Sequence, residues 1–146
     1  HKIFDTNFHG AFRACQIFAD YFKQHDNPTS IINIGSISGN TPLSDRFIQS
    51  ASKAALHNLT RNLAREWAEF DIRVNTLIPG FFPAERSATM LDEAKVLDII
   101  RKTPTSRFGR PEELIGATLL LASNTAGSFI TGSEIVVDGG FSTTSI

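Results

Sequence analysis

Three polar side chains in residues 36–53 have types and a spacing suited to chemistry on a polar substrate. Ser36 carries a hydroxyl group, Gln49 an amide and Lys53 an ammonium group, with Gln49 and Lys53 four residues apart. On a helix, residues four apart lie on one face. Hydroxyl and amide groups can hold a substrate oxygen, and the ammonium group supplies positive charge. Glutamine cannot titrate, so position 49 offers hydrogen bonds but no general acid or base.

Ser36 is predicted to lie at the carboxyl end of a strand. The residues before it form a short β-branched run that a glycine stops: Ile31, Ile32, Ile34 and Gly35. Such a run is typical of a buried strand in a parallel sheet. The loop that follows, up to about residue 47, is rich in Ser, Gly, Pro and Asn. The hydroxyl group of Ser36 is therefore expected at an end of the sheet.

A helix is predicted from about Gln49 to Phe70. Its apolar residues recur every three or four positions and form one stripe: Leu56, Leu59, Leu63, Trp67 and Phe70. Gln49 and Lys53 fall at the start of this helix, on one face. Both side chains can therefore point into a site beside Ser36.

A helix before the strand is predicted from Phe4 to Phe22. Its apolar stripe also has a spacing of threes and fours: Phe4, Phe8, Ala11, Cys15, Phe18 and Phe22. After the second helix, a further strand pattern contains Ile72, Val74, Leu77 and Ile78 and is broken by Pro79 and Gly80. Strand, helix and strand in this order predict a right-handed crossover and parallel pairing.

The remaining elements continue the alternation of helices and strands. A helix is expected near residues 90–102, and Pro111, followed by two glutamates, starts another that runs to about Ser123. A last strand is expected over residues 134–138, closed by Gly139 and Gly140. We find no internal repeat. The fold class predicted is α/β, with three parallel strands and flanking helices.

Composition and charge exclude several classes of function. The chain has 146 residues, 41% of them hydrophobic, and a formal charge of −1 with both signs interspersed. This size predicts one domain over residues 1–146, and the charge gives no footprint for nucleic acid or a membrane surface. No apolar run is long enough to span a membrane, and no signal peptide is visible. A single cysteine excludes a disulfide scaffold, so we expect a cytoplasmic protein. The histidines, including His57, show no metal-ligand spacing.

Five segments, in this order and spacing, resemble the carboxyl-terminal part of the short-chain dehydrogenase/reductase family. They are DTNFHGAF, INIGSISGNTPLSDRFIQSASKAAL, VNTLIPGF, RFGRPEELIGATLLLAS and TGSEIVVDGG. The resemblance covers nearly the whole chain. It implies part of a Rossmann-like, doubly wound parallel sheet. A strand near Ile31 would then have an open edge where the other half of the domain belongs.

The resemblance also implies roles for the polar residues. The family has a serine after a strand and then Tyr-x-x-x-Lys at the start of a helix; Ser36 and Lys53 match, and Gln49 stands in place of the tyrosine. In the family, that tyrosine gives or takes the substrate proton, the lysine lowers the pKa of the phenol, and the serine holds the substrate oxygen. Asn7 occupies the position of a fourth active-site residue that holds a proton-relay water.

The cofactor implied is NAD or NADP. Lys53 would bind the nicotinamide ribose, and the turn at Pro79 and Gly80, with Phe82, would contact the nicotinamide. The family's Gly-rich pyrophosphate turn would lie before His1, because no Gly-x-Gly-x-x-Gly pattern occurs in the chain. We therefore expect an amino-terminally truncated domain, whose missing part would distinguish NAD from NADP.

Two hypotheses of function follow. The first is an NAD(P)-dependent oxidoreductase that interconverts a secondary alcohol and a ketone of a small molecule. The strings PGFFPAE and SRFGRPEEL are similar to members that act on sugar acids such as mannonate or fructuronate. The second is an inactive relative, either a fragment or an oligomerising or ligand-holding subunit. In either case the resemblance implies a homo-oligomer that buries part of the Phe-rich first helix. Outside the family context, Ser36 would be a turn residue and Asn7 a polar surface residue.

Overall fold

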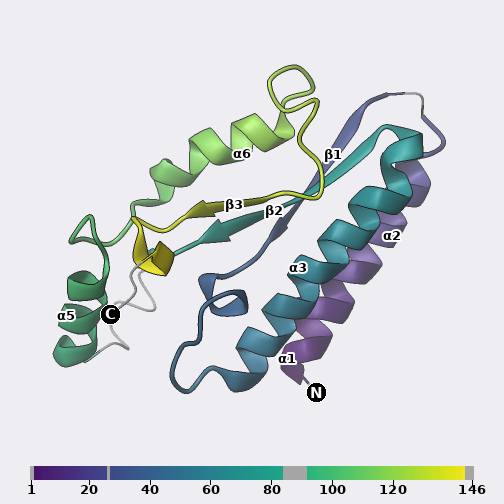
Figure 1. Ribbon diagram of the computed structural model, residues 1–146. Coiled ribbons are helices and arrows are strands. Elements are labelled where there is room, and N and C mark those ends of the chain that lie inside the picture. Colours follow the sequence, from purple (N-terminus) through teal and green to yellow (C-terminus); the bar gives the residue numbers. More distant parts are fainter. Residues whose placement is uncertain (1, 26, 84–91, 144–146) are drawn as a thin grey trace.

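A computed structural model describes residues 2–25, 27–83 and 92–143 (Figure 1). Its centre is a parallel sheet of three strands, β1 (Thr29–Ile34), β2 (Ile72–Pro79) and β3 (Glu134–Val137), in the order β1-β2-β3. Figure 1 shows the two long helices on one face of the sheet and α6 on the other. The predicted α/β class and the three parallel strands are confirmed.

The middle strand forms the interior of the sheet. Residues 72–78 of β2 are all buried, as expected for a strand with a neighbour on each side. β1 was expected to be buried as well, but within it only Asn33 is buried, and 52% of Ile34 is exposed. The physical reason is that β1 pairs with β2 alone among the described residues. The predicted open edge is confirmed.

The first helical segment is continuous but changes type along its length. It consists of α1 (Lys2–Phe4), a π-helical turn (Asp5–Gly10) and α2 (Ala11–Phe22). Apolar periodicity predicted the extent of the helix but not the π-helical turn. π-Helical turns are rare, and those that occur often lie at functional sites. This one contains Asn7.

The helices α2 and α3 (Phe47–Trp67) pack on the sheet and on each other. One core cluster joins them to β2: Cys15, Ala19, Leu63, Ala64, Trp67, Ile72 and Val74. Two residues of the predicted stripes are exposed rather than packed in the core, because Phe18 is 56% exposed and Phe70 is 42% exposed. A short 3-10 turn (Ala68–Phe70) ends the second helical segment, so Phe70 leaves the direction of the stripe.

The carboxyl-terminal half closes the other side of the sheet. It contains α5 (Glu93–Lys102), a 3-10 turn (Pro111–Leu114) and α6 (Ile115–Ala122). The helix predicted near 90–102 therefore begins within the described residues at Glu93, and residues 84–91 lie outside them. A second core cluster, Ile37, Ile78 and Phe141, joins this half to the loop after β1.

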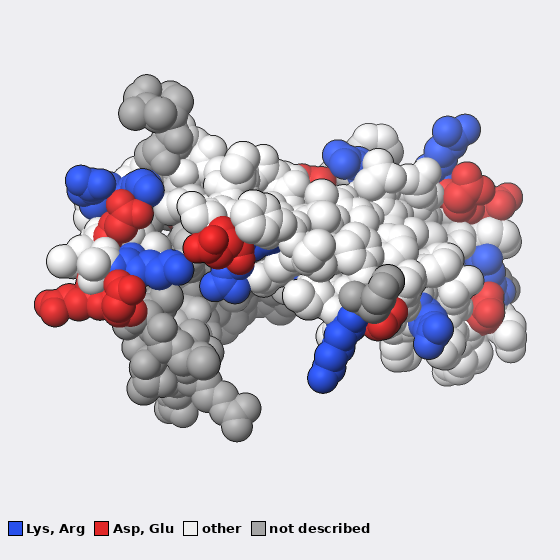
Figure 2. Space-filling model, turned by 90° about the horizontal axis from the view of Figure 1, so that it is seen from below, with Lys and Arg blue, Asp and Glu red and all other residues white. Residues whose placement is uncertain are grey.

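The surface carries charges of both signs and some apolar side chains. Figure 2 shows basic and acidic residues interspersed on one face. On α2, Ile17, Phe18 and Tyr21 are each more than half exposed. An oligomer that covers this face stays a prediction. No helix among residues 2–25, 27–83 and 92–143 is long and apolar enough to cross a bilayer.

Candidate active site

Ser36 lies where β1 ends and the chain turns toward α3. It is the N-cap of a 3-10 turn (Ile37–Gly39), and its hydroxyl oxygen accepts a hydrogen bond from the backbone N–H of Ser38 at 3.2 Å. The hydroxyl groups of Ser36 and Ser38 are also hydrogen-bonded at 2.9 Å. Serine is favoured at such a position because its oxygen satisfies an otherwise unpaired N–H. Ser36 is half-buried at the carboxyl end of its strand, as the sequence predicted.

Lys53 reaches the same end of the sheet from α3. Its Nζ atom donates a hydrogen bond of 2.7 Å to the carbonyl oxygen of Ile34, two residues before Ser36. Partial burial of the ammonium group lowers the pKa of Lys53. One N–H of the ammonium group makes this bond, and the group has three donors. Lys53 is therefore a positive charge held beside the end of β1 with capacity for a ligand.

Gln49 lies in the first turn of α3 and is half-buried. Its Oε1 atom accepts a hydrogen bond of 2.9 Å from the guanidinium group of Arg46. This contact orients the amide, so that its NH₂ group is the part available to donate to a ligand. Arg46 was not among the predicted site residues. The sequence contained one signal for this contact, because Arg46 lies three residues before Gln49 at the start of the helix.

Asn7 is joined to the start of α3 through a buried serine. The Nδ2 atom of Asn7 donates to Ser52 Oγ at 3.1 Å, and Ser52 Oγ donates to the backbone oxygen of Gln49 at 2.7 Å. Ser52 is fully buried. Asn7 thus lies against the predicted site, but it contacts the residue before Lys53. Ser52 was missed because its side chain lies on the buried side of the helix.

The carboxyl end of β2 packs tightly against the end of β3. The backbone N–H of Gly80 donates to the carbonyl oxygen of Val137 at 2.9 Å. A Cβ atom on Gly80 would lie 2.6 Å from Cα and Cβ of Asp138, so only glycine fits without displacement. The predicted break at Pro79 and Gly80 is wrong in detail: Pro79 is the last residue of β2 and pairs with Val137, and Gly80 follows directly, at the same end of the sheet as Ser36.

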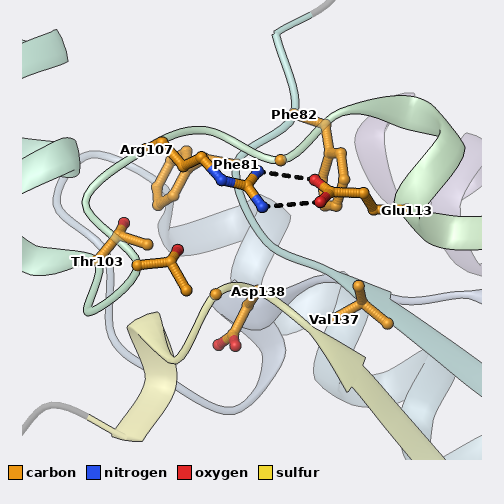
Figure 3. A pocket seen from close by; sticks show the side chains of 10 residues that line it. Phe81, Phe82, Thr103, Arg107, Glu113, Val137 and Asp138 are labelled. Carbon is orange, nitrogen blue, oxygen red and sulfur yellow. Dashed lines mark hydrogen bonds and ion pairs between the residues drawn. The ribbon is translucent and has the colours of Figure 1, made fainter.

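Phe82 was predicted beside Pro79 and Gly80, and the structure places its ring against Gly109. There it lines a cavity of about 160 Å³ whose wall includes Arg107 and Glu113 (Figure 3). The guanidinium group of Arg107 makes two hydrogen bonds to the Glu113 carboxylate, of 2.7 and 2.8 Å. This pairing, with the backbone N–H of Arg110, lowers the pKa of Glu113 to about 2. The ion pair fixes the start of the 3-10 turn that precedes α6.

A larger cavity of about 420 Å³ lies between the loop at residues 41–46 and α5. Its apolar wall includes Phe81 and Phe141, and its rim carries Arg46, Lys95 and Lys102. The carboxylate in its wall is that of Asp98, which already accepts hydrogen bonds from Lys102 and Arg101. The cavity therefore has an excess of positive charge. Ser36, Gln49 and Lys53 line neither of the two cavities.

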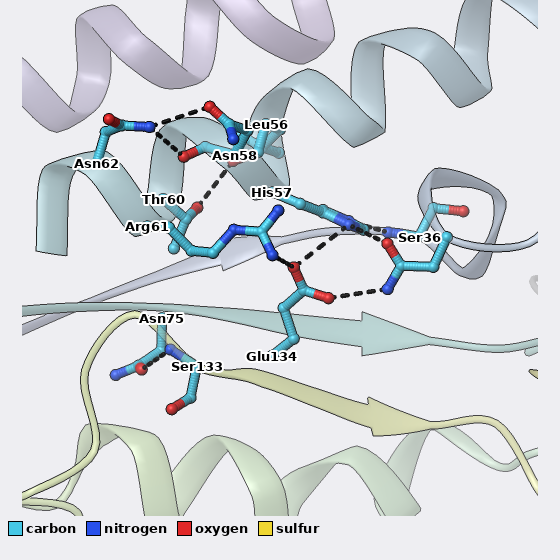
Figure 4. Close-up of polar contacts among 11 residues, drawn as sticks. Ser36, Leu56, His57, Asn58, Thr60, Arg61, Asn62, Asn75, Ser133 and Glu134 are labelled. Atoms are coloured by element: carbon cyan, nitrogen blue, oxygen red, sulfur yellow. Dashed lines mark hydrogen bonds and ion pairs between the residues drawn. The ribbon is translucent and has the colours of Figure 1, made fainter.

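His57 is a further polar residue at the end of β1, and sequence reasoning considered it only as a metal ligand. It is 1% exposed, and its Nε2 atom lies 3.3 Å from the backbone nitrogen of Ser36 (Figure 4). Its place four residues after Lys53 was the missed signal, since Gln49, Lys53 and His57 then share one helix face. Among the described residues, no group of three or more His, Cys, Asp or Glu is placed to hold a metal ion.

The arrangement can bind an oxygen-bearing group but has little to transfer a proton. Ser36 offers a hydroxyl group and Lys53 an ammonium group at the carboxyl end of β1, and Gln49, one turn before Lys53 on α3, offers an amide NH₂ group. Crevices at these strand ends are where open α/β sheets bind their ligands. Of these side chains, only the lysine titrates, and its positive charge favours negative charge on a nearby ligand.

Comparisons with known proteins identify relatives of this chain. A family model described as enoyl-(acyl carrier protein) reductase matches residues 1–142. The chain is 39% identical over 145 residues to the uncharacterized oxidoreductase UxuB of Bacillus subtilis, covering 95% of this chain and 52% of that protein. It is 40% identical to the ribulose-forming D-arabinitol 2-dehydrogenase of Candida tropicalis, covering 96% and 51%.

A solved structure gives the same result for the fold. The gluconate 5-dehydrogenase of Burkholderia cenocepacia, in complex with NADP and tartrate, superposes with a TM-score of 0.90 at 32% identity. The match covers 95% of this chain and 54% of that protein. The chain thus spans about half the length of the relatives it matches.

Proposed function

The chain belongs to the short-chain dehydrogenase/reductase family, and from this premise we propose that it forms part of an NAD(P)-dependent oxidoreductase that interconverts a secondary alcohol and a ketone. The observation that carries the proposal is the contact between Lys53 Nζ and the carbonyl oxygen of Ile34. It holds a cation beside Ser36 at the strand end, where the family's order of residues requires one.

The residues present fit the nicotinamide half of the cofactor. The ammonium group of Lys53 has donors left for ribose hydroxyl groups, and Pro79 with Gly80, held against the end of β3, would contact the nicotinamide. Phe82 is proposed as a further contact, two residues after Gly80. When bound, the nicotinamide supplies or accepts the hydride. The chain carries no Gly-x-Gly-x-x-Gly pattern for the pyrophosphate, so we assign only this half of the cofactor to its residues.

The positively charged cavity favours a substrate that bears a carboxylate. Arg46 and Lys95 on its rim can pair with an acid group, and its apolar wall can pack against a carbon chain. The relatives include a gluconate 5-dehydrogenase and D-arabinitol dehydrogenases, which are named for a sugar acid and a polyol. We propose a polyhydroxylated substrate, with a sugar acid as the preferred class.

Gln49 limits what this site does to the substrate oxygen. We propose that it occupies the position of the family's tyrosine. Its NH₂ group would donate a hydrogen bond to that oxygen beside the Ser36 hydroxyl, but it cannot transfer a proton at neutral pH. A positioned general acid or base is typically worth about 100-fold to 10,000-fold in rate. Proton exchange would then depend on water near Asn7, and turnover should be slow.

The contact between Arg46 and Gln49 favours a second candidate function. Because Arg46 holds the amide oxygen, Gln49 and the guanidinium group together present hydrogen-bond donors. Such a pair is suited to hold a carbonyl or carboxylate group without converting it. The chain would then be a ligand-holding relative in which binding persists and turnover does not.

Direct measurement separates the two candidates. The purified chain is titrated with NADH and NADPH by fluorescence, and then assayed with gluconate, mannonate and D-arabinitol in the oxidative direction and with ketone sugars in reverse. Binding with slow turnover supports the oxidoreductase. Sugar-acid binding without turnover supports the ligand-holding protein. If neither cofactor nor sugar acid binds at millimolar concentration, both candidates are wrong for this chain.

A further inference from the structure

We propose that His57 is the positioning residue for Ser36, acting as a neutral imidazole with its hydrogen on Nδ1. Its place in the structure is the interior of the turn that carries Ser36, between α3 and the end of β1. The positioning of Ser36 by His57 depends only on contacts within this chain. Its consequence for a substrate oxygen rests on the function proposed above.

The hydrogen bonds define the protonation state of the ring. The backbone N–H of Ser36 donates to His57 Nε2 at 3.3 Å, so Nε2 must carry its lone pair rather than a hydrogen. The Nδ1 atom then carries the hydrogen and donates to Asn40 Oδ1, 3.1 Å away. A hydrogen on Nε2 would point at the Ser36 N–H and break the first bond.

The second ring nitrogen is coupled to the far strand. The amide nitrogen of Asn40 donates to Glu134 Oε2 at 2.8 Å, and Glu134 is the first residue of β3. This bond orients the Asn40 amide with its oxygen toward His57. Figure 4 shows the imidazole of His57 between Ser36 and Glu134. The chain of contacts therefore runs from the Ser36 backbone through His57 and Asn40 to the third strand.

The backbone of the Ser36 turn packs directly against the ring. A Cβ atom on Gly35 would overlap His57 Nε2, and one on Gly39 would lie 2.6 Å from His57 Cε1. The imidazole is thus enclosed by the two glycines that flank the Ser36 turn. Both glycines are required because the backbone passes directly against the ring. The turn cannot shift along the helix without displacing His57.

The charged groups around His57 come from two elements. Glu134 on β3 lies 3.9 Å from Nδ1, and Lys53 and Arg61 flank the ring along α3. Desolvation of the buried ring is the main effect and lowers the pKa of His57; Glu134 opposes it, and Lys53 and Arg61 add to it. The neutral ring required by the hydrogen bonds is therefore also the form that burial favours.

The consequence is a fixed position for the Ser36 backbone, and therefore for the hydroxyl group that it carries. The N–H group that donates to His57 belongs to Ser36, and the side chain of Ser36 is the one proposed to face the ligand. If this bond is lost, the backbone of the Ser36 turn gains freedom, and the hydroxyl group that Ser38 orients moves with it. A positioning residue of this kind should affect turnover or ligand affinity without touching the ligand itself.

The test compares two substitutions of similar size. His57→Gln places an amide oxygen near the position of Nε2 and keeps an acceptor for the Ser36 N–H, whereas His57→Phe fills the space without an acceptor. In the parent chain, ¹⁵N-histidine NMR should show the Nδ1–H tautomer at pH 7.5. Hydrogen exchange of the Ser36 amide should be at least 10-fold faster in His57→Phe than in His57→Gln. Exchange of the Val74 amide in β2 should be equal in both.

Each outcome decides the proposal independently of enzymatic activity. An Nε2–H tautomer in the parent chain would overturn it, and so would equal Ser36 exchange in the two variants. If His57→Phe does not fold, two measurements remain. The parent chain should show the Nδ1–H tautomer, and the Ser36 amide should exchange at similar rates in the parent and in His57→Gln; the opposite result in either measurement would overturn the proposal. Where turnover is measurable, His57→Gln should keep kcat/KM within about 3-fold of the parent, and His57→Phe should lose at least 10-fold. Absence of turnover in all proteins would count against the proposed function but not against the positioning.

Discussion

The side chain of Lys53 donates a hydrogen bond to the last residue of β1: its Nζ atom lies 2.7 Å from the carbonyl oxygen of Ile34. A helix residue and a strand end are thereby joined at the position where a dinucleotide ribose would bind in the proposed function. The bond also explains why Lys53 is half-buried although it carries a charge. The predictions below concern this end of the sheet.

Replacement of Lys53 by methionine should weaken binding of NADH or NADPH by at least 10-fold. Methionine keeps the length and packing of the side chain but removes the donors, and hydrogen bonds to a charged group are worth about 1.5–3 kcal/mol. Fluorescence titration of the purified chain measures the change. Arg65→Gln, which removes an exposed charge from the same helix, is the control and should leave affinity unchanged. Equal affinities of parent and Lys53→Met would exclude the ribose-binding role.

Gln49→Tyr should raise the rate of alcohol oxidation, because it introduces a titratable hydroxyl group beside Lys53. The expected gain is about 100-fold or more, the typical value of positioned proton transfer. Gln49→Phe is the matched control, since it adds the ring without the hydroxyl and should give no gain. Steady-state absorbance of the reduced nicotinamide measures the rates. A gain that is the same for both variants would show that ring packing, rather than proton transfer, is responsible.

Gly35→Ala should destabilise the fold by about 1–3 kcal/mol, the usual cost of overpacking a close-packed site. The new methyl group would overlap His57 Nε2 and lie 2.7 Å from Thr76 Cγ2. Gly116→Ala is the control, because no atom lies within 4 Å of its added Cβ in α6. There alanine should stabilise the helix by about 0.5–1 kcal/mol. Urea unfolding measures both, and two changes of the same sign would contradict the structure.

Acidification below pH 6.5 should destabilise the folded chain through His57. Burial lowers the pKa of His57 from its ordinary value of 6.5, so the unfolded state takes up a proton more readily. The stabilisation is complete above pH 6.5 and is lost as the pH falls toward the lower pKa of the folded state. One proton gives a slope of at most about 1.4 kcal/mol per pH unit.

Urea unfolding of the parent and of His57→Gln at a series of pH values tests this effect. Glutamine does not titrate, so the variant should show a flatter dependence between pH 6.5 and 5. Parallel curves would mean that His57 binds protons equally in the folded and unfolded states. The two proteins differ only at residue 57, so the difference between their curves isolates the contribution of His57.

The sequence by itself determined the class of fold and the order of its elements. Short apolar, β-branched runs and periodicities of three to four residues, with Gly and Pro at the breaks, are local properties, and they located all three strands and the main helices. The same local patterns placed Ser36 at the end of a strand and Gln49 and Lys53 on one turn of helix. These are short-range consequences of residue type and spacing.

Tertiary structure alone decided which polar groups are joined. The bonds of Lys53 to Ile34, of Asn7 to Ser52 and of Ser36 to His57 link residues 19 to 45 positions apart, and no local period reports such a distance. The π-helical turn around Asn7 and the exposure of Phe18 were likewise not visible in the apolar pattern. The physical reason is that burial and hydrogen bonding depend on which elements meet in space, whereas periodicity depends only on how each element forms.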